Sequence, residues 1–143
     1  MTVRNNTVTL TSSGSQSYGG IALGAVAPNG RLAQNAPGHS AVAILGNTLV
    51  DCGYAPIWLN AGGNVSAVGN RLVTPFHAPS PGGLPHCCMP LPAEAIAVFA
   101  SGVQGLTLAG NCVQPAPPGE GSLQFLLNVT NSTGAWEGGV MLC

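Results

Sequence analysis

The chain has 143 residues, the size of one domain whose core needs neither a metal nor disulfides to hold it together. Only 5% of the residues are charged and the formal net charge is -1, whereas ordinary domains carry about 25% charged residues. Three scattered arginines and no lysine cannot form a phosphate-binding patch, which excludes nucleic acid as a partner. A chain this poor in charge is expected to bury much of its surface against neighbours.

No apolar run approaches the roughly 18 to 20 residues that a membrane-spanning helix needs, so no membrane partner is expected. The chain contains 21 Gly and 12 Pro, yet 45% of it is hydrophobic. Disordered chains combine low hydrophobicity with high net charge, so we expect a folded, turn-rich protein. Residues 1–6 lack the apolar core of a signal peptide, which predicts synthesis and assembly in a cytoplasm.

The first ten residues mix apolar and polar side chains, with regular alternation over residues 7–10, and predict a short strand. Residues 11–20 are mostly Ser and Gly, a composition typical of a flexible linker. We therefore expect an extended N-terminal arm and linker over residues 1–17. A single β domain is expected to follow over residues 18–143.

Four Gly/Asn dipeptides are flanked by short apolar arms. They are Gly46-Asn47, Gly69-Asn70, Gly110-Asn111 and, in reversed order, Asn29-Gly30. Gly and Asn accept the positive φ that primed two-residue turns require, so each dipeptide predicts a β-hairpin. Four short hairpins predict a mainly β fold, either a small β-sandwich or a β-barrel, with a β-tulip-like domain as one form.

Two of these segments are similar over a longer stretch. Residues 46–56 and 69–79 share six identities in eleven positions, at an offset of 23. Two explanations stay open at this point, a duplicated unit or similar turns that arose independently in a restricted alphabet.

Residues 75–92 contain six prolines, which remove backbone donors and fix φ, so this segment cannot be a central strand. Residues 92–100 hold the one helical candidate, because Pro92 suits a first helical turn and Glu94 lies near the positive end of the dipole. At most one short helix is therefore expected, and the same apolar residues suit a strand equally well.

The five cysteines are odd in number and irregular in spacing, which predicts small buried hydrophobes in most cases. The five cysteines are Cys52, Cys87, Cys88, Cys112 and Cys143. A single disulfide formed outside the cell stays open as an alternative. His77 and His86 join Cys87 and Cys88 as zinc-ligand types, but the spacing fits no template and adjacent side chains in an extended chain point to opposite faces. We expect no metal and no cofactor.

Catalytic machinery is not indicated either. A thiol activated by imidazole and oriented by Asp51 would need groups that no sequence pattern brings together, and the acidic residues lie too far apart for a paired-carboxylate mechanism. We therefore expect no enzyme and no catalytic residue.

The aromatic residues suit a sugar-stacking platform or, more commonly, a β core. Those considered are Tyr54, Trp58, Phe76 and Trp136.

Residues 20–45 carry a family resemblance. A Gly-rich arm leads into the apolar run 21–26, then into the turn Asn29-Gly30-Arg31, and then into the apolar run 41–45. This order resembles the head-decoration (cement) proteins of tailed bacteriophages. The resemblance implies a mainly β structural virion protein that forms a homotrimer on the capsid surface and ties neighbouring major capsid protein subunits together. It also implies assembly in the host cytoplasm, with the major capsid protein and further copies of the chain as partners.

Such a protein would stabilise the expanded shell by binding to it, and its N-terminal arm is the segment best suited to add a strand to a capsid sheet. The capsid-contact candidates are Val3, Arg4, Thr7, Val8 and Leu10. The oligomer-interface candidates are Phe76, His77, His86, Trp136, Met141 and Leu142. The alternative function is a disulfide-stabilised secreted or surface binding module, with carbohydrate as a candidate ligand.

Overall fold

The computed structural model describes residues 1–9, 20–24, 39–52, 55–73, 96–115 and 125–143. This part of the chain contains fourteen strands and no helix. The strands are β1 (Thr2–Arg4), β2 (Thr7–Thr9), β3 (Ile21–Leu23), β4 (His39–Leu45), β5 (Thr48–Val50), β6 (Ile57–Asn60), β7 (Gly62–Val68), β8 (Arg71–Val73), β9 (Ile96–Ser101), β10 (Leu106–Ala109), β11 (Asn111–Gln114), β12 (Phe125–Thr130), β13 (Gly134–Ala135) and β14 (Val140–Leu142).

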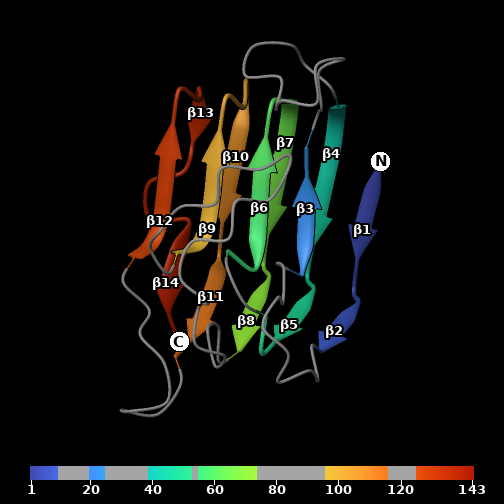
Figure 1. The fold of residues 1–143 in the computed structure, drawn as a ribbon, viewed down its shortest axis with the longest axis vertical. Coiled ribbons are helices and arrows are strands. Elements are labelled where there is room, and N and C mark those ends of the chain that lie inside the picture. The colour runs from blue at the N-terminus through green and yellow to red at the C-terminus, as the bar shows by residue number, and fades with distance from the viewer. Residues whose placement is uncertain (10–19, 25–38, 53–54, 74–95, 116–124) are drawn as a thin grey trace, which may run out of the picture.

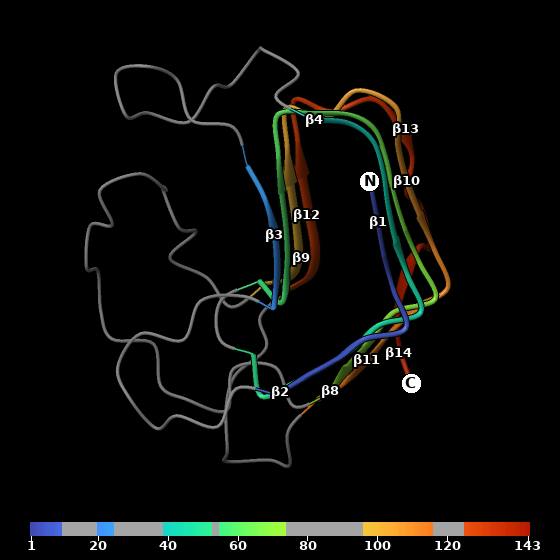
Figure 2. The same cartoon turned by 90° about the vertical axis from the view of Figure 1, so that its right-hand side faces the viewer.

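The strands form three sheets in which neighbouring strands are parallel. The first sheet has the order β1-β4-β7-β10-β13, the second β14-β11-β8-β5-β2 and the third β12-β9-β6-β3. Each of the first four rungs therefore adds one strand to every sheet in turn, and the last rung adds β13 and β14 to the first two sheets. This arrangement is a parallel β-helix. Figure 1 shows successive rungs side by side, and Figure 2 looks along the stack, with the three sheets around a common interior.

The core consists of side chains that stack from rung to rung. The register aligns Leu49 of β5, Leu72 of β8 and Val113 of β11, and each of these side chains is 0% exposed. In the first sheet Val42 and Val65 are aligned in the same way and are also buried. Burying one such aliphatic side chain stabilises a fold by about 1.5–3 kcal/mol, so these columns supply much of the stability.

The mainly β prediction is confirmed, whereas the hairpins are wrong at the three described Gly-Asn dipeptides. Each dipeptide joins a strand of the first sheet to a strand of the second, and neither strand folds back on the other. Only the glycine has positive φ, at 60° for Gly46, 64° for Gly69 and 58° for Gly110. A type I′ hairpin turn needs two such residues, so the chain bends through a corner instead. Asn29-Gly30 lies outside the described residues.

A parallel β-helix thus replaces the predicted sandwich or barrel, and it also explains the internal similarity. The register pairs Thr48 with Arg71 and Val50 with Val73, so the offset of 23 is the length of one rung. Neighbouring rungs are longer, since Thr7 pairs with Thr48. Residues 46–50 and 69–73 are therefore the same corner and strand in consecutive rungs.

The predicted short helix is wrong over residues 96–100, which belong to strand β9. Ile96, Ala97 and Val98 are all 0% exposed, so both faces of this strand are covered. Parallel strands buried on both faces read as continuous apolar runs and show no alternation. Residues 92–95 lie outside the described residues. At the N-terminus, residues 2–4 and 7–9 of the expected arm form the first strands of two sheets.

Candidate binding surfaces

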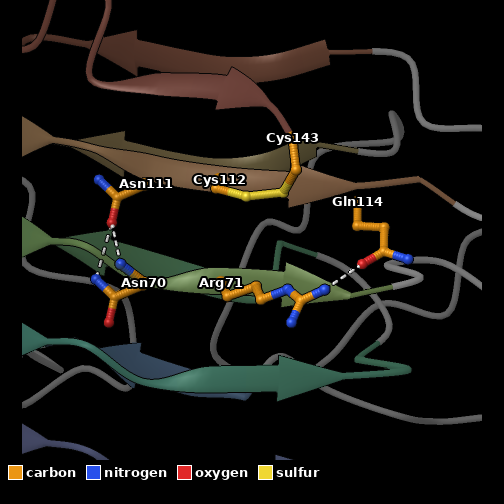
Figure 3. Close-up of a disulfide and its surroundings, with 6 residues drawn as sticks. All are labelled: Asn70, Arg71, Asn111, Cys112, Gln114 and Cys143. Carbon is orange, nitrogen blue, oxygen red and sulfur yellow. Dashed lines mark hydrogen bonds between the residues drawn. A yellow bond between two sulfur atoms is a disulfide. The ribbon is translucent and has the colours of Figure 1, made fainter.

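A ladder of asparagines lines the corner between the first and second sheets. Asn6, Asn47, Asn70 and Asn111 occupy the same corner in four successive rungs. At each step the Oδ1 of one asparagine accepts the backbone N–H and a side-chain N–H of the asparagine one rung earlier, at 2.8–3.1 Å. Figure 3 shows the step from Asn70 to Asn111. The last three are at most 1% exposed, so these amides satisfy buried backbone groups and are structural.

The two ends of this ladder differ. Asn111 Nδ2 donates to the backbone carbonyl of Gly139 at 3.0 Å, and Val140 stands in the ladder position of the last rung. At the opposite end Asn6 donates through its backbone and side-chain N–H groups. Within the described part of the chain, however, no group donates to Asn6 Oδ1. The ladder is therefore closed by a carbonyl at one end and has an open acceptor at the other.

Strands β1 and β2 form what we call the N-terminal edge. Among the described strands, β1 pairs with β4 alone and β2 with β5 alone. The Met1 carbonyl accepts Ala43 N–H at 2.9 Å and Asn5 N–H donates to the Leu45 carbonyl at 3.0 Å. Because the backbone groups of a strand alternate in direction, the N–H groups of Thr2 and Arg4 lie on the open side. The edge can thus accept a further strand.

The capsid-contact candidates lie along this edge as far as the structure describes them. Val3 and Val8 are half-buried, and Val8 packs against the core. Arg4 and Thr7 are exposed. Leu10 lies outside the described residues. The exposed pair is thus available for contact, whereas the two valines serve the fold.

Strands β13 and β14 form the C-terminal rung, which holds the described oligomer-interface candidates. Trp136 is half-buried and packs against the core. Met141 is 50% exposed and Leu142 is 58% exposed. Glu137, which sequence reasoning did not single out, is exposed in the corner between the two strands. Three further candidates lie outside the described residues: Phe76, His77 and His86.

A disulfide joins Cys112 of β11 to Cys143, with 5.3 Å between their Cα atoms. Figure 3 shows that it bridges the last two rungs of the second sheet. The expectation that most cysteines are free and buried is therefore wrong for this pair, because the register places Cys112 opposite Met141, two residues before Cys143. The open alternative of one disulfide is the one that the structure contains. Cys87 and Cys88 lie outside the described residues.

Cys52 is the free cysteine of the described residues, and it is 0% exposed. The pKa of its thiol is raised to about 11, first by burial and then by the charge of Asp51, and a hydrogen bond with the Gly20 backbone opposes both. A thiol with so high a pKa carries almost no thiolate near neutral pH and is a poor nucleophile. Asp51 therefore acts against the thiol activation that was considered from the sequence.

The outward face of the third sheet carries the aromatic residues that the structure brings together. Trp58 alternates with the core residues Ile57 and Leu59, and its ring stacks on Phe99 with 6.3 Å between centroids and 14° between planes. Trp58 and Asn60 are each 4% exposed, and the buried atoms Trp58 Nε1 and Asn60 Nδ2 have no hydrogen-bond partner. An unsatisfied buried donor costs about 1–3 kcal/mol.

Of the four aromatic residues considered for a sugar platform, Trp58 and Trp136 lie in the described part of the chain, and the structure does not bring these two together. Trp136 lies in the corner between β13 and β14, away from β6, and Tyr54 and Phe76 lie outside the described residues. Phe99 was missed, although it stands 41 positions after Trp58, opposite it in the parallel register. Trp58 is buried and Phe99 is half-buried, so the pair packs as part of the fold.

Across the described ranges, no group of three or more His, Cys, Asp or Glu side chains could hold a metal ion. Nor does any helix in that part of the chain have the length and apolarity to cross a membrane. No protein-family model, curated protein or solved structure matches the chain. The functional argument therefore rests on the open edges, the exposed side chains and the disulfide.

Proposed function

We propose that the chain is a structural virion protein that decorates and stabilises an icosahedral phage capsid by binding between major capsid protein subunits. The observation that carries this proposal is the N-terminal edge, in which β1 and β2 each pair on one side only. Main-chain groups on such an edge can pair with a strand of another protein. The resemblance of residues 20–45 to head-decoration proteins supplies the partner.

The low charge supports burial in a lattice. Within the described residues the charged side chains are Arg4, Asp51, Arg71 and Glu137, so most of the β-helix surface can be covered without desolvating an ion. Binding to the assembled shell alone would stabilise it by mass action. With free protein at 100 times the Kd, each occupied site contributes about 2.7 kcal/mol.

The proposal is tested at the main chain of the edge. Thr2→Pro and Thr7→Pro each remove a backbone N–H on the open side of the edge. The carbonyl of Asn6 accepts Thr48 N–H at 2.8 Å and so faces β5. Because backbone groups alternate along a strand, the N–H of the next residue, Thr7, faces the open side, as that of Thr2 does. The matched controls Thr2→Ala and Thr7→Ala keep the N–H. Co-sedimentation with shells of the phage or prophage whose genome carries this chain should show weaker binding for the proline variants alone. Equal binding by all four folded variants would reject the edge as the capsid contact.

The disulfide favours a second candidate, a secreted or surface binding module. Cys112 and Cys143 pair covalently, and such bonds persist mainly in oxidising compartments. Alkylation of thiols in intact producing cells, followed by mass spectrometry, separates the two candidates. Modified Cys112 and Cys143 would favour cytoplasmic assembly, whereas an unmodified pair, together with binding to a surface glycan, would favour the module.

A further inference from the structure

The exposed large apolar side chains of the described residues are confined to the two ends of the β-helix. Met1, next to β1, is 67% exposed. At the other end Phe125 of β12 is 49% exposed, and Met141 and Leu142 of β14 are 50% and 58% exposed. β12 and β14 are the terminal strands of the third and second sheets. Terminal units of repeat proteins need polar outer surfaces to stay soluble alone. The C-terminal end, with three exposed apolar side chains, lacks such a surface, whereas the N-terminal edge exposes one large apolar side chain, Met1.

Opposite charges occupy one corner at the two ends. The register places Arg4 in a column with Leu45, Val68 and Ala109. Glu137 lies two positions after Ala135, and Ala135 pairs with Thr107, which lies two positions before Ala109. Beyond Ala135 the chain turns, and Gly139 N–H donates to the Trp136 carbonyl. Glu137 therefore lies in the corner between β13 and β14, which is the corner that Arg4 precedes in the first rung. The middle rungs are apolar at the position of Arg4.

Hydrogen-bonding groups at the two ends are complementary as well. Asn111 N–H donates to the Gly139 carbonyl at 3.0 Å and Cys143 N–H to the Val113 carbonyl at 2.9 Å. By the alternation of a parallel strand, the N–H of Val140 points to the open side of β14. Val140 stands in the ladder position of the last rung. In three of the four earlier rungs, those of Asn6, Asn47 and Asn70, the backbone N–H at this position bonds to an asparagine Oδ1 one rung ahead. The open acceptor in the described chain is Asn6 Oδ1.

We propose that copies of this 143-residue chain stack head to tail, with the C-terminal rung of one copy on the N-terminal edge of the next. Val140 N–H would then bond to Asn6 Oδ1 of the neighbour, and Glu137 would lie at the same corner of the junction as the neighbour's Arg4. The first and second sheets continue across the junction, and Met1, Met141 and Leu142 are covered. The third sheet has four strands, so one strand position stays open between β12 and β3 of the neighbour.

This junction is heterologous, so it extends into open stacks rather than closing as a dimer. One N-terminal edge stays free at the end of each stack, which leaves a surface for the capsid proposed above. Stacking itself needs no capsid. Its test can therefore fail or succeed independently of the proposed function.

The test is sedimentation velocity of the purified chain over a range of concentrations, with circular dichroism as the check on folding. Arg4→Glu and Glu137→Arg should each raise the apparent dissociation constant about fivefold or more, since a close opposite pair becomes a like-charge pair. The double variant Arg4→Glu/Glu137→Arg restores the attraction and should return to within about twofold of the original chain.

Arg71→Glu is the matched control. It makes the same charge change as Arg4→Glu but lies on the middle strand β8, where Arg71 bonds to Gln114 at 2.7 Å, so stacking should be unchanged. Higher salt should reduce the difference between the single variants and the original chain. The proposal is overturned if the chain stays monomeric at all concentrations, if it forms a closed trimer that grows no further, or if the double variant behaves like the singles.

Discussion

Replacing an inner asparagine of the ladder should cost far more stability than replacing the outermost one. In Asn70→Ala, Asn47 loses the acceptor of its backbone N–H at 2.9 Å and of one side-chain N–H at 3.0 Å, both of which bond to Asn70 Oδ1. The donations from Asn70 Nδ2 to the Ile44 carbonyl and to Asn111 Oδ1 are lost too. All of these groups are buried, so water does not replace the lost partners.

The orphaned backbone N–H costs roughly 2 kcal/mol, and three further net hydrogen bonds cost roughly 1 kcal/mol each, a total of about 5 kcal/mol. Asn6→Ala removes two donated side-chain bonds, and Asn47 Oδ1 keeps its bond from the Asn6 backbone, so the expected cost is about 1 kcal/mol. For a chain of this size 1 kcal/mol corresponds to about 3 °C. Thermal unfolding should therefore place Asn70→Ala about 15 °C below the original chain and Asn6→Ala about 3 °C below it. Equal shifts would refute the ladder as a buried network.

Three further results are expected. Cys143→Ser removes a cross-link over a sequence separation of 31, so the free energy of unfolding should fall by about 3.5 kcal/mol. Reductant should lower the melting temperature of the original chain but not that of the variant. No response in either protein would contradict a stabilising disulfide. Because the pKa of Cys52 is raised to about 11, the folded state holds this proton longer than the unfolded state, so stability should fall as the pH rises from about 9 towards 11; Cys52→Ala should lose that part of the pH dependence. Trp58→Phe removes the unsatisfied Nε1 donor while keeping a ring against Phe99. The free energy of unfolding should therefore stay within about 1 kcal/mol of that of the original chain. A decrease of more than about 2 kcal/mol would indicate that the indole N–H is hydrogen-bonded.

The corners could be located from the sequence, but their geometry could not. Gly46-Asn47 and Gly69-Asn70 mark a residue with positive φ, and that preference is common to primed hairpin turns and to the corners of a solenoid. What distinguishes solenoid corners from hairpin turns is that the strands after the dipeptides pair with one another in parallel register. Successive asparagines are 41, 23 and 41 residues apart, so no single period reveals the repeat.

Unequal connections explain this loss of periodicity. Six residues separate β5 from β6, whereas twenty-two separate β8 from β9. The strand signal was nevertheless present in residues 57–60 and 96–101, which are apolar or small on both faces. Continuous apolar runs of this length favour parallel, doubly covered strands over hairpins, whose exposed faces alternate.

The surfaces at the two ends of the β-helix depend on the register of the rungs, so they could not be predicted from the sequence. Arg4 and Glu137 are 133 positions apart in the sequence, and only the order of the rungs places them at the same corner. The disulfide between Cys112 and Cys143 needs the same information, since adjacent rungs bring the two residues together.

The groups of this molecule that can bind another protein lie at the ends of the β-helix rather than along its sides. Along the sides, each inner strand of the described sheets already pairs with a neighbour on both edges, which occupies its main-chain groups. At the ends, edge strands, exposed apolar side chains, one open ladder acceptor and two opposite charges coincide. Unpaired parallel edges of this kind are a liability unless something covers them. Both the capsid contact and the stacking junction are therefore expected to respond to changes in the N-terminal edge, and substitutions on the outer faces of the middle rungs should leave both unchanged.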